Sequence, residues 1–245
     1  MPEGPSILLM KESLQCFCGQ KVLQANGNAK IDMALLEGKT LLEIKTFGKQ
    51  TYLVFDTINV RIHLLMFGSY SIDEQTKPDA QLRLALHFKT GGMYFYTCSV
   101  KLLDNVYLST IDWEADVLSD EWNPEKANQK LIAKPQMMVC DALMNQDIFS
   151  GVGNIIKNEV LFWIGVHPES LIGHLPPEKL DKLIFEARNY SFDFLKWKKE
   201  YTLRKHWLAH TKKICARDGD KIVKEYLGKT QRRTFFCNTC QVLYK

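Results

Sequence analysis

The sequence predicts an α+β protein of several domains, in the order N-terminal helix, two-layer β-sandwich, helical domain and C-terminal hairpin. Short strand-like runs separated by turn signals fill most of the first 100 residues. Helical periodicity takes over after an acidic, irregular segment at 104–126. A Cys-x2-Cys pair follows a strand-like run near the end. We therefore place the domains at 1–112, 113–205 and 206–245.

The first domain is predicted to begin with a helix over 6–18 and to continue in strands. Gly19 can stop the helix, whose apolar face is formed by Ile7, Met10, Leu14 and Phe17. Two β-rich runs then surround a turn at 47–49 in "KTLLEIKTFGKQTYLVFD". The further runs are "INVRIHLLMFGSYSI", "LRLALHF" and "GGMYFYTCSVKLL". Short strands at this spacing indicate a sandwich or a barrel.

The second domain is predicted to contain helices over 126–133 and 137–146, and two more that begin at recognisable signals. One begins after "SGVG" at Asn154, which we expect to cap it. Another begins after "LPPEK", where Pro176 and Pro177 suit a helix start. Near the end, the strand-like run "RRTFFC" predicts a small hairpin that carries cysteines.

Composition indicates an ordinary soluble protein. Of 245 residues, 46% are hydrophobic and 24% are charged. No apolar run approaches the roughly 20 residues of a membrane span, so we expect no membrane partner. No signal peptide is visible, so a cytoplasmic protein is expected, associated with the nucleoid if the source is bacterial. In that reducing compartment the seven cysteines are expected to be thiols or metal ligands.

Charge is distributed unevenly along the chain. Residues 196–245 contain 14 basic and 4 acidic residues, whereas the rest contains 18 basic and 24 acidic residues. A basic end on an acidic body suggests a polyanionic partner. A solvated tail is the alternative, but aromatic residues are interleaved with the basic ones, which favours a folded element.

The opening "MPEG" offers an unusual nucleophile. Met1 is normally trimmed before a small residue, which would leave Pro2 with a secondary α-amine beside Glu3. An α-amine has a pKa near 8, against about 10.4 for lysine, so about a tenth of it is neutral at pH 7. Attack on a sugar aldehyde carbon would give an iminium (Schiff-base) cation, with Glu3 placed to transfer protons. The alternative is an inert chain end.

Two further motifs suggest contacts with nucleic acid. The "GVGN" segment, Gly151 to Asn154, precedes a helix, and its backbone N–H groups suit a phosphate. A plain loop is the alternative there. In "HLLMFG", Leu65, Met66 and Phe67 suit either an ordinary core or apolar wedges inserted into an opened base stack.

Cysteines near the end indicate a metal site. Cys237 and Cys240 form a knuckle suited to tetrahedral zinc. The expected upstream pair is incomplete, because Cys215 is followed by Asp218 where a second cysteine would stand. Either Asp218 is an oxygen ligand or His210 completes the site. A zincless hairpin is the alternative.

Together these motifs resemble the formamidopyrimidine-DNA glycosylase/endonuclease VIII family, and more closely its endonuclease VIII branch. The resemblance is carried by "PEGP", the "GK" turn at Lys49, "GVGNIIKNEVLFWIGVHP" and "RRTFFCNTCQ", in the family's order and spacing. It implies a two-layer β-sandwich, a helix–two-turns–helix domain and a C-terminal zinc or zincless finger. It also implies that the protein binds double-stranded DNA and flips out the damaged nucleotide. This chemistry does not need a dimer, so we expect a monomer.

The resemblance also implies roles for individual residues. Pro2 is similar to the nucleophile that attacks C1′, and Glu3 to the acid that protonates the opening deoxyribose. Lys49 matches a lysine that contacts phosphate and assists base release and elimination. Phosphate contacts are implied for Asn154 and for the finger arginine, Arg232. Insertion into the emptied base stack is implied for Met66, with Leu65 and Phe67 beside it.

The implied activity is that of a bifunctional DNA glycosylase and abasic-site lyase in base excision repair, which nicks the strand by β,δ-elimination. Oxidised pyrimidines, ring-opened purines and abasic sites are the implied substrates, and a structural zinc ion is the implied cofactor. Ser6 stands where the family usually has a glutamate. This departure and the incomplete cysteine set leave open a lesion-binding protein of the same fold that excises bases weakly or not at all.

Overall fold

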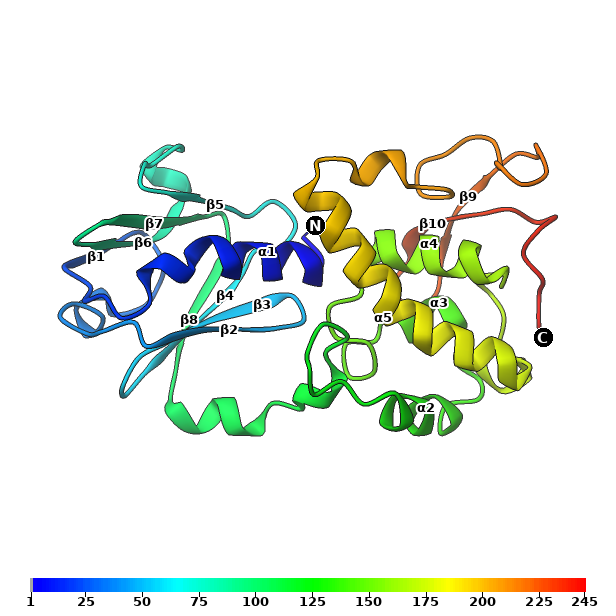
Figure 1. The fold of residues 1–245 in the computed structure, drawn as a ribbon, viewed down its shortest axis with the longest axis horizontal. Helices are drawn as coiled ribbons and strands as arrows, with labels where there is room; N and C mark the ends of the chain where they lie inside the picture. Colours follow the sequence, from blue (N-terminus) through cyan, green and yellow to red (C-terminus); the bar gives the residue numbers. More distant parts are fainter. Residues whose placement is uncertain (1) are drawn as a thin grey trace. The chain divides into compact units, whose positions relative to one another are not determined.

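The computed structural model describes residues 2–245 and divides into two compact units (Figure 1). The first ends at Ile111, and the second is Asp112–Lys245. The C-terminal hairpin belongs to the second unit, together with the helices that precede it.

The first unit begins with helix α1, Gly4–Leu14, which is followed by the 3-10 turn η1, Gln15–Phe17. The helix begins two residues before the predicted position because Pro5 is compatible with a first helical turn. The predicted apolar face is confirmed, since Ile7, Met10, Leu14 and Phe17 are all buried. Gly19 ends the segment with a φ of +83°, a left-handed conformation that suits glycine.

Two antiparallel four-stranded sheets follow, which confirms the predicted two-layer β-sandwich. One sheet has the order β1-β6-β7-β5 and the other β2-β3-β4-β8. The strands are β1 Gln24–Asn26, β2 Glu43–Phe47, β3 Gln50–Val54, β4 Asn59–His63, β5 Ser69–Ile72, β6 Leu82–Phe88, β7 Gly91–Tyr96 and β8 Ser99–Leu103. Strand β1 has only three residues and no apolar alternation, which explains why the sequence did not predict it.

Alternation along each strand separates the sandwich core from its outer surface. In β4, Val60 and Ile62 are buried in the core that also includes α1. His63 therefore projects from the opposite face, and its register partners are Gln50 on β3 and Ser99 on β8. Helix α1 packs on β2 and β3.

The second unit contains four α-helices and one hairpin within its described residues. These elements are α2 Pro124–Ile132, α3 Val139–Met144, α4 Asn154–Ile164, α5 Pro177–Lys199, β9 Val223–Leu227 and β10 Arg232–Phe236. Helix α2 begins at Pro124 because the Asn123 side chain accepts the Lys126 N–H. Helix α3 is shorter than predicted because Met138 and Asn145 are extended.

Helix α4 is central to the second unit, since it packs against α3, α5 and β10. The prediction that Asn154 caps α4 is wrong. The N-cap residue is Gly153, no side chain caps the helix, and Asn154 is its first helical residue. None of the helices over residues 2–245 combines the length and the apolar character needed to cross a membrane.

Candidate functional site

The residues predicted to carry chemistry in the first unit begin at Pro2 and Glu3, directly before α1. Glu3 is the N-cap residue of α1, and its backbone carbonyl accepts the N–H groups of Ser6 at 2.8 Å and Ile7 at 3.3 Å. Its side chain does not cap the helix, although the residue is only 3% exposed. The helix start therefore fixes a buried carboxylate beside residue 2.

Lys49 lies in the tight turn between β2 and β3, where Gly48 has a φ of +56° and Phe47 pairs with Gln50. Lys49 is 9% exposed, which is unusual for a lysine. In Figure 1 the start of α1, the β2–β3 turn and the β4–β5 turn lie at the same end of the first unit. The fold thus gathers these three segments at one end of the sandwich.

The turn between β4 and β5 carries Leu65, Met66 and Phe67, and all three are exposed. Phe67 is the most open of them, at 78%. The core interpretation of these residues is therefore wrong. Three adjacent exposed apolar side chains on one turn form a surface of the kind that marks an interaction site.

In the second unit, α4 and β10 run in the same direction. Three side chains of α4 form hydrogen bonds with three consecutive residues of β10. The Asn154 amide donates to the Arg233 carbonyl at 2.9 Å, and the Lys157 ammonium donates to Thr234 Oγ1 at 2.8 Å. Asn158 Oδ1 accepts the Phe235 N–H at 3.2 Å.

This register defines the position of Arg232. Side chains alternate along a strand, so Arg232 shares the face of Thr234 and lies toward the N-terminus of α4. An arginine, an amide donor and a helix N-terminus therefore come together at this point. The Asn154 Nδ2 group has a second hydrogen beyond the one given to Arg233, which leaves a donor for an anion.

A buried polar run on α4 was not predicted from the sequence. Lys157, Asn158 and Glu159 are each 1% exposed. Glu159 accepts the backbone N–H groups of Leu208 at 2.7 Å, Ala209 at 3.0 Å and His210 at 2.6 Å. Burial raises the pKa of Glu159, and these N–H groups act against that increase. The run ties the C-terminal segment to α4.

His210 is used within this network and is not among the metal-binding candidates. Its Nδ1 lies 3.0 Å from the Asn158 amide nitrogen. Burial lowers its pKa to about 4, and the charges of Lys157 and Arg233 act in the same direction. The ring is therefore neutral at pH 7.

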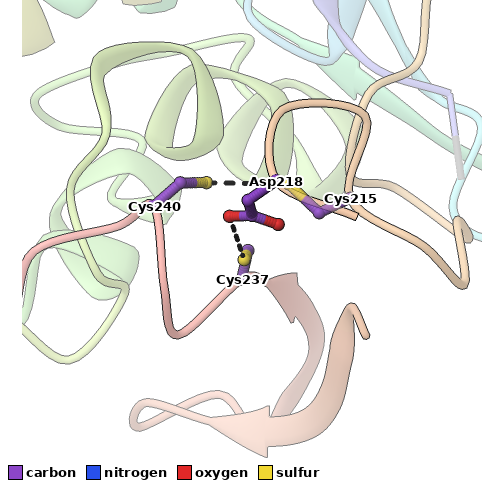
Figure 2. A group of neighbouring side chains, drawn as sticks. All are labelled: Cys215, Asp218, Cys237 and Cys240. Atoms are coloured by element: carbon purple, nitrogen blue, oxygen red, sulfur yellow. Dashed lines mark hydrogen bonds between the residues drawn. The ribbon is translucent and has the colours of Figure 1, made fainter. Parts of the chain in front are cut away.

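A four-residue cluster matches the predicted metal site. The candidate ligand atoms of Cys215, Asp218, Cys237 and Cys240 all lie within 4.8 Å of one another. Figure 2 shows the four side chains converging from two loops, one that precedes the hairpin in the sequence and one that follows it. The structure thus brings Asp218, rather than His210, to the three thiols.

Distances within the cluster suit tetrahedral zinc. The sulfurs of Cys215 and Cys240 are 3.8 Å apart, and the Cys237 sulfur lies 3.2 Å from Asp218 Oδ2. Zn–S bonds of about 2.3 Å at tetrahedral angles place two sulfurs about 3.8 Å apart. The other carboxylate oxygen, Asp218 Oδ1, accepts the Asp220 N–H at 3.0 Å, which orients Oδ2 toward the thiols.

The protonation chemistry of the cluster also suits a cation. Burial and the neighbouring Cys215 and Cys237 thiols raise the pKa of Cys240 to about 12. The pKa of Asp218 is lowered, chiefly by the Asp220 N–H. A divalent cation would compensate the charge of the thiolates that form when it binds, so these residues fit a divalent metal.

The fold is that of Fpg-type DNA glycosylases. The Fpg protein of Lactococcus lactis, in a complex with DNA that contains an abasic site, superposes with a TM-score of 0.85 at 20% identity, over 98% of this chain and 99% of that chain. A viral DNA glycosylase gives the same TM-score at 18% identity, over 98% of this chain and 100% of that chain.

Sequence models of protein families assign the chain to a family, which the likeness in fold alone does not. The formamidopyrimidine-DNA glycosylase N-terminal domain matches residues 1–102, and the H2TH domain of the same enzymes matches residues 114–190. The chain belongs to the formamidopyrimidine-DNA glycosylase/endonuclease VIII family, on its endonuclease VIII-like side, which confirms the predicted family.

Similar curated proteins include several endonuclease 8-like proteins. Endonuclease 8-like 3 of Xenopus laevis is 30% identical over 231 residues, or 90% of this chain and 38% of that protein. Endonuclease 8-like 2 of Bos taurus is 32% identical over 190 residues, or 72% of this chain and 56% of that protein. Endonuclease 8-like 2 of Mus musculus is 26% identical over 98% of this chain and 96% of that protein. The chain thus spans 38% of the length of the endonuclease 8-like 3 relative from Xenopus laevis.

Proposed function

We propose that this protein is a base-excision-repair DNA glycosylase and abasic-site lyase. The observation that carries the proposal is the buried Glu3 carboxylate, fixed at the start of α1 directly after Pro2. Family membership supports it, because the two matched domain models are both those of DNA glycosylases. The proposed substrate is double-stranded DNA that contains an oxidised pyrimidine, a ring-opened purine or an abasic site, bound by a monomer.

The proposed reaction begins when removal of Met1 exposes the Pro2 amine. The amine nitrogen forms a bond to C1′ of the flipped-out nucleotide and gives up its proton. The bond from C1′ to the damaged base breaks, and the base leaves with a proton. Glu3 then protonates the ring oxygen of the deoxyribose as the sugar opens, which leaves an iminium cation between Pro2 and C1′.

The iminium cation withdraws electrons and so acidifies the C2′ protons. Loss of one C2′ proton expels the 3′ phosphate in β-elimination, and a second elimination expels the 5′ phosphate. Water then releases the sugar fragment from Pro2. Lys49 is proposed to contact a phosphate beside the reacting sugar and to assist base release and elimination, since an ammonium stabilises charge that develops on a leaving oxygen.

The second unit is proposed to hold the DNA backbone. Arg232 and Asn154 would bind phosphates that flank the lesion, together with the N-terminus of α4. Leu65, Met66 and Phe67 would fill the gap left by the extruded nucleotide, and their exposure supports this role.

Zinc is proposed as a structural cofactor held by Cys215, Asp218, Cys237 and Cys240. When bound, the ion cross-links the loop before the hairpin to the loop after it, and takes no part in the reaction. The hydrogen bonds from α4 to β10 would then hold Arg232 in place on a hairpin that is closed at its base.

Borohydride trapping tests the proposed reaction. Purified protein is incubated with duplex DNA carrying one abasic site, borohydride is added, and mass spectrometry locates any covalent adduct. The proposal expects the adduct on Pro2 and no Met1. Pro2→Gly is expected to bind the DNA but to lose most strand cleavage.

Two results would contradict the proposal. Unchanged cleavage by Pro2→Gly would refute the assignment of the nucleophile. If the wild-type protein binds abasic DNA tightly and forms no adduct, the result would instead favour a lesion-binding protein of the same fold. Ser6 and Asp218 raise this alternative, because both depart from the family pattern.

A further inference from the structure

The exposed apolar turn between β4 and β5 is closed by a backbone hydrogen bond. The Gly68 N–H donates to the Leu64 carbonyl at 2.7 Å. A Cβ atom at Gly68 would lie 2.1 Å from that carbonyl oxygen, so only glycine fits there. This bond fixes the end of the turn but not its beginning.

The beginning of the turn has an unfavourable backbone conformation. Leu65 has a φ of +54°, in the left-handed region that L side chains rarely adopt. Leucine has no polar atom that would stabilise this conformation locally, unlike asparagine or aspartate. A second interaction must therefore hold it.

His63 provides that interaction. The Leu65 N–H donates to His63 Nδ1 at 3.0 Å. His63 ends β4, where pairing with β3 and β8 fixes its backbone, so the imidazole is a rigid acceptor. Burial and the charges of Lys49 and Arg61 lower the pKa of His63, which favours the neutral imidazole. The Leu65 N–H then selects the tautomer in which Nδ1 carries no proton.

We propose that His63 is the positioning residue of the apolar turn: its Nδ1 acceptor holds Leu65 in the left-handed conformation and thereby keeps Met66 and Phe67 directed into solvent. The conformational part stands on the geometry of the turn alone. The consequence for DNA rests on the proposed function, in which these side chains enter the base stack.

Two near-isosteric substitutions separate this role from simple packing. In His63→Asn, the side-chain oxygen can accept the N–H two residues on, as Nδ1 does. In His63→Gln, the longer side chain carries its oxygen toward the position of the other ring nitrogen. A packing role predicts similar effects from both variants, whereas a positioning role predicts that only asparagine preserves the turn.

The first measurement uses the free protein with 13C-labelled methionine methyl groups, and Met66→Leu assigns the Met66 signal. Wild type and His63→Asn are expected to show one narrow Met66 signal at the same shift. His63→Gln is expected to shift or broaden it while the other methionine signals stay in place, which also shows that the variant is folded. An unchanged Met66 signal in His63→Gln would overturn the proposal.

Leu65→Gly supplies an independent check, because glycine adopts positive φ without strain. In that background, His63→Gln is expected to affect the Met66 signal less than it does in the wild type. An equal effect in both backgrounds would mean that His63 acts in some way other than holding Leu65, and would also overturn the proposal.

The second measurement uses duplex DNA with a tetrahydrofuran abasic analogue opposite 2-aminopurine, whose fluorescence rises on unstacking. Wild type and His63→Asn are expected to give the same rise, and His63→Gln at least a threefold weaker affinity. If wild-type protein binds without any rise, insertion into the stack is refuted, while the Met66 signal still decides the conformational claim. If the rise occurs and His63→Gln matches wild type in both measurements, the positioning role alone is refuted.

Discussion

Replacing Glu159 by glutamine tests how the C-terminal segment is held on α4. The carboxylate accepts three backbone N–H groups, two on Oε1 and one on Oε2. Glutamine is nearly the same size but has only one acceptor oxygen. If that oxygen takes the place of Oε1, the NH2 group faces the Leu208 N–H, and two donors meet in a buried site.

The expected loss follows from these contacts. Hydrogen bonds to a charged group contribute about 1.5–3 kcal/mol, neutral ones about 0.5–1.5 kcal/mol, and an unsatisfied buried donor costs about 1–3 kcal/mol. Burial raises the pKa of Glu159, so removing its charge recovers part of the desolvation cost. We expect a net loss of about 2 kcal/mol.

Urea unfolding followed by circular dichroism measures this loss, and about 2 kcal/mol corresponds to a midpoint lower by about 1 M. Limited proteolysis is expected to cut first near 206–210 in the variant, where the lost contacts lie. Glu121→Gln is the matched control, since Glu121 is exposed. A Glu159→Gln variant as stable as the control would refute the conclusion that this carboxylate anchors the segment.

Three further outcomes are expected. Arg232→Ala should weaken binding to lesion DNA about tenfold and reduce the slope of log affinity against log salt by about one, because one phosphate contact is lost. Asp218→Ala should lose zinc to a chelator faster than the wild type, as followed by native mass spectrometry, because one of four ligands is removed. Between pH 6.5 and 4 the free energy of unfolding should fall more in wild type than in His210→Asn. The buried His210 has a pKa of about 4, below its unfolded value, so only the unfolded state gains its proton over this range.

Each of these outcomes has a matched comparison. The controls are Arg204→Ala for the finger arginine, Asp220→Ala for the ligand carboxylate and His174→Asn for the buried imidazole. Equal DNA affinities for the two arginine variants would contradict the phosphate contact. Unchanged zinc release in Asp218→Ala would exclude the carboxylate as a ligand. Parallel pH profiles for wild type and His210→Asn would show that His210 does not contribute to acid sensitivity.

Local patterns predicted the fold well where burial follows a simple period. The apolar face of α1 and the alternation in β4 both follow from side-chain spacing alone, and the structure confirms the buried residues. The Cys-x2-Cys spacing likewise identified Cys237 and Cys240, the expected upstream pair pointed to Cys215, and Asp218 completed the set as one of two alternatives.

Local sequence patterns failed to predict the role of a polar side chain whose hydrogen-bond partner is distant in the sequence. Asn154 looked like a helix cap, but its amide is bonded to a hairpin strand 79 residues away. Lys157, Asn158 and Glu159 would normally be assigned to a solvent-facing surface. Three consecutive residues span most of a helical turn, however, so in a helix rich in apolar residues they could not all face water. His63 was overlooked because its role depends on the φ of Leu65, which local sequence does not reveal.

The buried polar run on α4 has a consequence for how the chain can be divided. A chain cut before residue 206 would keep α4 but would remove the hydrogen-bond partners that Thr234, His210 and Leu208 now provide to a buried ammonium, an amide and a carboxylate. Such a fragment is expected to expose α4 and to aggregate rather than to persist as a trimmed helical domain. The C-terminal finger therefore cannot be removed without disrupting the helices before it, because the last 40 residues complete the interior of that domain. A truncation that separates two compact units of this protein belongs near Ile111 instead.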